Sequence, residues 1–147
     1  MDNLQRIDDW LAALLAKLTP AERKALLRTV ARDLRKRQQD RIRLQQNPDG
    51  SAFEPRRVSL KDKKGGIRRQ MFSKLRAAKY LKASATATEA DVGFIGSAQR
   101  LARVHHYGLR DRVREHGPVV KYAARQLLGM DEPTIDAIRT ALMAHLD

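Results

Sequence analysis

The sequence predicts an α+β fold in a single domain, residues 1–147, and three observations support this prediction. Apolar residues recur at intervals of three and four near both chain ends, which is the spacing of amphipathic helices. Between them, YLKASATAT and ADVGFIG alternate apolar and polar residues, as half-exposed strands do. Aromatic residues make up only 5% of the chain, so the core must rest mainly on aliphatic side chains. We expect two N-terminal helices, a small antiparallel sheet with an intervening helix, and a C-terminal helix.

Two helices are expected before residue 47. The apolar positions of the first are Leu4, Ile7, Leu11, Leu14, Leu15 and Leu18. The second is long and basic, and it begins at a capping box with Thr19 as N-cap, Pro20 at the first helical position and Glu22 three residues after the cap. Few apolar residues occur from Arg35 to Gln46, so we expect the end of this helix to leave the core.

The segment after the second helix is predicted to be a flexible arm at about residues 47–68. It opens with NPDG, where proline fixes φ, aspartate can bond to its own backbone and glycine accepts a positive φ, so a tight turn is expected. The glycine pair and charges of VSLKDKKGGIRRQ suit a flexible excursion. We expect the arm to reach a neighbouring subunit or the DNA path, and its candidate turn and assembly residues are Pro48, Asp49, Gly50, Phe53 and Pro55.

The remaining elements follow from shorter patterns. MFSKLRAA is a candidate short helix, and the two alternating segments would pair as a hairpin around Glu89-Ala90. SAQRLARVHHYG predicts a helix capped by Ser97 and ended by Gly108. LRDRVREHGP is expected to form a loop or edge strand, and VVKY a short strand. The final helix has Asp131 as its cap.

The pattern of histidines, serines and glycines argues against an enzyme. His105 and His106 are adjacent, so on a helix they point about 100° apart and cannot grip one metal ion. We expect His105 to be half-buried and His106 exposed. The sequence contains no HExxH motif, nucleophile elbow or phosphate loop, and it has no cysteine for a disulfide or thiolate metal site. We therefore expect no catalytic residue, no metal and no cofactor. Neither a secretory signal nor an apolar run of membrane-spanning length is present, so a soluble protein is expected.

The positive charge is concentrated in the middle of the chain. The net charge is +13, but residues 1–19 carry −1 and residues 129–147 carry −3, which leaves +17 for residues 20–128. Such a block suits a nucleic acid or an acidic protein surface, although it can also be only a solvated face. Few aromatic residues lie there, so base reading is not expected. The candidate basic face consists of Arg35, Lys36, Arg37, Arg41, Arg43, Arg56, Arg57, Lys61, Lys63, Lys64, Arg68 and Arg69.

An ordered set of motifs resembles the tail-completion S protein family of contractile-tailed phages, also called phage virion morphogenesis proteins. The segments are QQNPDGSAFEPRR, MFSKLRAAKYLK, VGFIG, ARVHHYGLRDRV and ARQLLG. The matching positions are Gln45, Gln46, Pro48, Asp49, Gly50, His105, Gly108, Arg125, Leu127, Leu128 and Gly129. This chain departs from the family pattern at His106, where members often carry glutamine, and at Ala124, where they often carry proline.

The resemblance implies a structural virion protein without catalysis. Such a protein would complete the head-proximal end of the tail and help join it to the head, as a subunit of a ring, expected to be hexameric, around the DNA channel. Its implied partners are further copies of itself, tube or sheath proteins, head-side connector proteins and genomic DNA, with no membrane. Assembly is expected in the host cytoplasm. The alternative function is a free basic nucleic-acid-binding or packaging accessory protein.

Overall fold

The computed structural model describes residues 3–56, 70–112 and 115–146, and it confirms the α+β fold. The helices are α1 (Asn3–Leu15), α2 (Pro20–Arg43), α4 (Ser97–Tyr107) and α5 (Glu132–Leu146). The strands are β1 (Leu81–Ala85), β2 (Ala90–Phe94), β3 (Arg110–Arg112) and β4 (Val119–Lys121). Within the described residues, none of the helices is long and apolar enough to cross a membrane.

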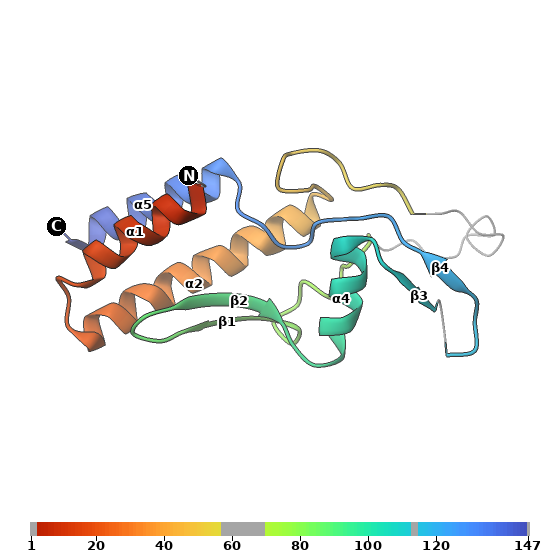
Figure 1. The fold of residues 1–147 in the computed structure, drawn as a ribbon, viewed down its shortest axis with the longest axis horizontal. Helices are drawn as coiled ribbons and strands as arrows, with labels where there is room; N and C mark the ends of the chain where they lie inside the picture. Colours follow the sequence, from red (N-terminus) through yellow and green to blue (C-terminus); the bar gives the residue numbers. More distant parts are fainter. Residues whose placement is uncertain (1–2, 57–69, 113–114, 147) are drawn as a thin grey trace.

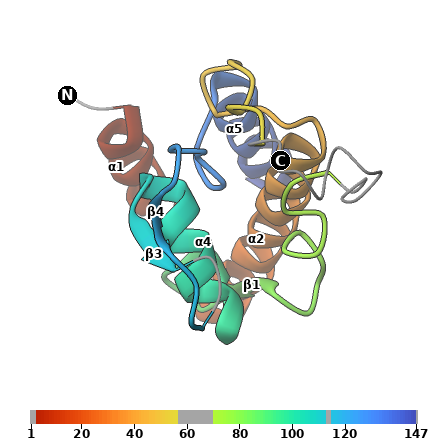
Figure 2. The same ribbon diagram turned by 90° about the vertical axis from the view of Figure 1, so that its right-hand side faces the viewer.

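Helix α2 is the central element of the fold. Helices α1 and α5 lie on one side of it and the β1–β2 hairpin lies on the other, while α4 and the β3–β4 hairpin gather near the C-terminal end of α2 (Figure 1). Seen from that end, α4, β3 and β4 lie to one side of α2 and α5 (Figure 2). The fold therefore has a helical end, which contains both chain termini, and a second end built around α4.

Two apolar cores correspond to these two ends. The first joins α1, α2 and α5 through Leu14, Leu15, Leu26, Leu27, Val30, Ile138 and Leu142. The second joins the end of α2 to the β1–β2 hairpin, α4 and three loops through Ile42, Phe53, Leu75, Leu81, Phe94, Ala98, Ala102 and Leu127. Both are mainly aliphatic, as the composition predicts.

The two ends of α2 differ in how well the sequence predicted them. The start is as expected: Pro20 is the first helical residue, and the Thr19 side chain accepts a hydrogen bond from the Glu22 N–H at 3.2 Å. The prediction that the other end leaves the core is wrong. Ile42 is fully buried and Arg41 is only 6% exposed, because loops distant in the sequence pack over the last turns of the helix.

The β1–β2 hairpin confirms the predicted alternation. The strands are antiparallel, with Leu81 opposite Phe94 and Ala85 opposite Ala90. Strands β3 and β4 form a second antiparallel pair, so the expected single sheet is two separate two-stranded sheets.

Three local predictions concern helix boundaries. MFSKLRAA is not a helix: it forms consecutive turns, and the left-handed φ of +66° at Phe72 is incompatible with helical continuation. The predicted cap of α4 is also wrong, because Ser97 is the first helical residue and Gly96 occupies the N-cap with a φ of +61°. Gly108 ends α4 as predicted, in the left-handed conformation that glycine adopts without steric cost.

Candidate functional site

The family-motif residues meet at the second end of the fold. We call this cluster the junction; it comprises residues 45–55, 105–108 and 125–129. The Gln126 N–H donates to the Asn47 side-chain oxygen at 2.9 Å, and the ring of Pro48 lies directly against Gly129. A Cβ atom at Gly129 would overlap that proline ring, so only glycine fits there. Motifs about 80 residues apart in sequence are thus in direct contact.

The turn at residues 47–51 has the predicted local chemistry. The Asn47 N–H donates to the Ser51 carbonyl at 2.8 Å, and Gly50 has a φ of +89°. The Asp49 carboxylate accepts hydrogen bonds from the Ser51 hydroxyl and N–H, which hold the pKa of Asp49 below its ordinary value. The expected tight turn is therefore present, but it packs onto the body of the protein instead of projecting from it.

Phe53 belongs to the core and does not extend from the surface. Its side chain is 4% exposed, and its ring meets Phe72 edge-on with 5.9 Å between centroids. Phe72 contacts the His105 ring at 4.9 Å, and His105 contacts Tyr122 at 4.6 Å. This row of rings links the turn after α2 to α4 and to the segment after β4. Edge-on pairs of this kind contribute about 0.5–1.5 kcal/mol each beyond simple burial.

Burial lowers the pKa of His105 below its ordinary value. The nearby positive charge of Arg125 lowers it further, while the Asp111 carboxylate opposes the shift. The Nδ1 atom of His105 is buried and meets no hydrogen-bond partner within the described part of the chain. His105 is half-buried, as predicted, and its neutral form is favoured. His106 is also half-buried, so its predicted exposure is wrong.

Arg125 attaches residues 54 and 55, which follow the turn, to the rest of the junction. It is 6% exposed, and its guanidinium donates to the Glu54 carbonyl at 2.8 Å and to the Pro55 carbonyl at 3.1 Å. Its own N–H donates to the His105 carbonyl at 2.8 Å. One buried arginine therefore joins three parts of the junction. Residues 47–55 of the expected arm are therefore fixed to the rest of the domain, and residues 57–68 of it lie outside the described residues.

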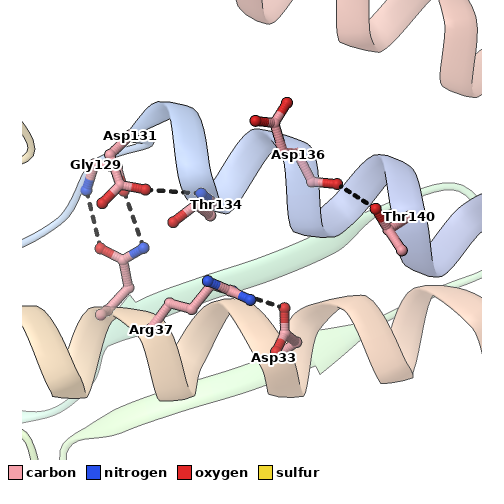
Figure 3. A network of polar contacts seen from close by, with 8 residues as sticks. Asp33, Arg37, Gly129, Asp131, Thr134, Asp136 and Thr140 are labelled. Atoms are coloured by element: carbon pink, nitrogen blue, oxygen red, sulfur yellow. Dashed lines mark hydrogen bonds and ion pairs between the residues drawn. The ribbon is translucent and has the colours of Figure 1, made fainter.

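A second set of contacts, not predicted from the sequence, fastens α2 to the RQLLG motif. Gln38, 4% exposed, donates to the Gly129 carbonyl at 2.9 Å and accepts from the Gly129 N–H at 3.1 Å. Arg41 donates to the Leu127 carbonyl at 2.9 Å and to the Gly129 carbonyl at 3.2 Å. The dashed lines at Gly129 in Figure 3 show the paired contact, next to the Asp131 cap of α5. The spacing of Gln38 four residues before Ile42 places both on one face of α2 and could have revealed this role.

The candidate basic face is only partly a surface. Arg41 is buried and structural, so its assignment to this face is wrong. Arg37 pairs with Asp33 at 3.0 Å and Arg43 with Asp40 at 3.8 Å. Lys36 is exposed, whereas Arg35 and Arg56 are half-buried. The other members, Arg57, Lys61, Lys63, Lys64, Arg68 and Arg69, lie outside the described residues.

Comparison with known proteins identifies the family. The chain matches the phage virion morphogenesis family over residues 2–147. It belongs to that family. Tail completion protein S of Escherichia phage P2 is 34% identical over 149 residues, an alignment that covers 100% of this chain and 99% of that protein. No solved structure matches. The resemblance predicted from the motifs is confirmed, and these matches support a structural role in the phage tail and a place in the virion.

This phage virion morphogenesis protein has one surface hollow that borders the junction and another that lies away from it. One, of about 430 Å³, is mostly apolar and lies between β2, α4 and residues 127–129, with His106 and Tyr107 in its lining. The other, of about 280 Å³, lies between α2 and β1 and is lined by three cations. No group of three histidine, cysteine or carboxylate side chains suited to a metal ion occurs among the described residues. Membership of a structural family suggests a non-enzymatic role.

Proposed function

We propose that this protein completes the head-proximal end of a phage tail and helps join the tail to the head, as a subunit of a ring around the DNA channel. The observation that carries the proposal is the match to tail completion protein S, which extends over nearly the full length of both chains.

The distribution of charge supports a head-to-tail contact between copies. Residues 20–128 carry a net charge of +17, whereas α1 and α5 each carry one Arg against two acidic residues, a net charge of −1 each. A ring needs a contact between two different surfaces of the subunit, and surfaces of opposite sign favour such a contact over one between like surfaces. We infer a ring of six subunits.

The junction gives this proposal a mechanical basis. Residues 47–55 are attached to α2, α4 and residues 125–129 by a buried arginine, a row of aromatic rings and backbone hydrogen bonds. A segment that follows such an anchor starts from a fixed position on the domain. We propose that the six cations of residues 57–69 contact an acidic neighbouring subunit, a connector protein or the DNA from that starting point.

Images of phage tails made with and without this protein test the proposal. We expect tails made without it to lack a finished head-proximal end and to remain separate from filled heads. A tagged copy should restore joining, and a label against the tag should appear at that end. Normal joined particles in the absence of the protein would refute the proposal.

The alternative is a free nucleic-acid-binding or packaging accessory protein, which the net charge of +13 favours. Such a protein would bind duplex DNA but would be missing from purified tails. Quantitative mass spectrometry of tails separated from heads distinguishes the two functions, since a ring subunit must be present in a fixed small number of copies per tail.

A further inference from the structure

The groove between α2 and β1 concentrates positive charge on the described surface. Lys24, Arg28 and Arg32 line one wall, spaced four residues apart, so their side chains form a row along one face of α2. All three are exposed. None of them takes part in an ion pair between described residues, and no carboxylate lines the groove. The row therefore differs from Arg37 and Arg43, whose charges are compensated within α2.

The floor of the groove adds backbone hydrogen-bond donors. The Thr86 N–H donates to the Glu89 carbonyl at 2.8 Å, which makes these two residues a hydrogen-bonded pair at the end of the β1–β2 hairpin. Along an antiparallel strand, the backbone N–H groups point alternately toward the paired strand and away from it. The N–H of Ser84 therefore points toward β2, whereas those of Ala83 and Ala85 point to the outer edge of β1. That edge borders the groove, since β2 contributes no residue to its lining.

The lining also limits what can bind. Its only apolar side chains are Ala31, Ala83 and Ala85, and it contains no aromatic ring. Protein interfaces depend on large apolar or aromatic anchors, and the binding of unpaired bases depends on stacking. The groove offers neither kind of side chain, so it suits neither a protein anchor nor an unpaired base. Small side chains do let a bulky anion approach the backbone N–H groups and the three cations closely. The groove thus has the chemistry of a site for phosphate groups.

We propose that this groove binds the sugar-phosphate backbone of duplex DNA without reading its sequence. Lys24 and Arg32 are eight residues apart, or about 12 Å along the helix axis. One strand of B-form DNA carries a phosphate about every 3.4 Å along its axis, so the same length offers about three or four phosphates to three cations. The choice of DNA as the polyanion rests on the proposed function, in which the genome passes through the ring.

The test compares two triple variants of the full chain by fluorescence anisotropy, with a labelled 20-base-pair duplex of arbitrary sequence over a series of salt concentrations. The groove variant combines Lys24→Gln, Arg28→Gln and Arg32→Gln. The control variant combines Lys74→Gln, Arg110→Gln and Lys121→Gln, which removes the same charge from exposed positions outside the groove. Circular dichroism checks that both variants remain folded, as expected for exposed side chains.

The groove variant should bind the duplex roughly 10- to 100-fold more weakly at 0.1 M salt, with a log–log salt slope shallower by about two to three units. The control variant should keep most of the wild-type affinity and slope. Equal weakening by both variants, or no duplex binding by the wild-type protein at low salt, would overturn the proposal. The DNA proposal would also be overturned if the groove variant bound the duplex like the wild type but no longer joined tails to heads. That result would indicate that the groove binds an acidic protein.

The outcome is separable from that of the proposed function. Failure of the DNA proposal appears as unchanged duplex affinity, whereas failure of the tail-completion function appears as normal joined particles when the protein is absent. A groove variant that has lost duplex affinity but still occupies purified tails would support both proposals, because it would separate DNA contact from assembly.

Discussion

Replacing Phe53 by alanine distinguishes a structural junction from a projecting arm. Phe53 is 4% exposed, packs in the second core and meets Phe72 edge-on. Truncating a buried phenylalanine to alanine costs about 3–5 kcal/mol, because apolar burial is lost and a cavity remains. A domain of this kind has a total free energy of unfolding of about 5–15 kcal/mol, so the change removes about a fifth or more of it. An arm residue would contribute nothing to that free energy.

Urea unfolding followed by circular dichroism measures the effect. With a denaturant slope of about 1–3 kcal/mol per molar, the midpoint should fall by roughly 2 M. Tyr107→Ala is the matched control, since it removes an aromatic ring that is 65% exposed, and it should change the free energy of unfolding by less than about 1 kcal/mol. If the free energy of unfolding of Phe53→Ala lies within about 1 kcal/mol of the wild-type value while tail joining is lost, Phe53 is a residue of a projecting arm and not of a structural junction.

Three further predictions follow from the same region. Gln38→Leu removes both hydrogen bonds between this side chain and Gly129, and it leaves the Gly129 N–H unpaired. Urea unfolding should therefore show a decrease of about 2–4 kcal/mol in the free energy of unfolding. A decrease of less than about 0.5 kcal/mol would contradict the role given to this glutamine. Gly108→Ala places a Cβ atom 2.9 Å from the backbone nitrogen of Ala124, at a residue whose φ is +67°. The melting temperature of this variant should therefore fall well below that of the control Gly93→Ala, whose added methyl group meets nothing within 4 Å. Equal melting temperatures for the two variants would be inconsistent with this packing. The lowered pKa of His105 means that the unfolded chain binds more protons around and below pH 6.5, so stability should decrease as the pH falls through and below that value. Thermal unfolding of His105→Phe should show a weaker dependence between pH 7.5 and 5.5, and an unchanged dependence would exclude this histidine as its source.

Local patterns predicted the elements whose formation depends on neighbouring residues. The start of α2 follows from a capping threonine and a proline at the first helical position, which act within one turn. The β1–β2 hairpin follows from strict alternation, because a shift of one residue would turn every apolar side chain to the solvent. Asp131 likewise caps α5 through the Thr134 N–H.

Local patterns misled where a distant segment decided the outcome. The end of α2 looks polar, yet its glutamine and arginine are buried, because backbone groups of residues 127 and 129 form hydrogen bonds with them. MFSKLRAA has a helical composition, but Phe72 takes a left-handed conformation in which its ring contacts both Phe53 and His105. In each place, contacts from elsewhere in the chain outweigh a propensity that is worth only a few tenths of a kcal/mol per residue.

The sequence by itself determined the fold class, the family and the excess of positive charge, because these depend on composition, period and the order of motifs. Only the tertiary structure decided which charges are surface and which are structural. Arg41 and Arg125 are buried donors to backbone carbonyls, whereas Lys24, Arg28 and Arg32 form a row beside β1 that has no ion-pair partner among the described residues. The physical reason is that a cation's role depends on the carbonyls, carboxylates and solvent that surround it, and those neighbours come from parts of the chain that only folding brings together.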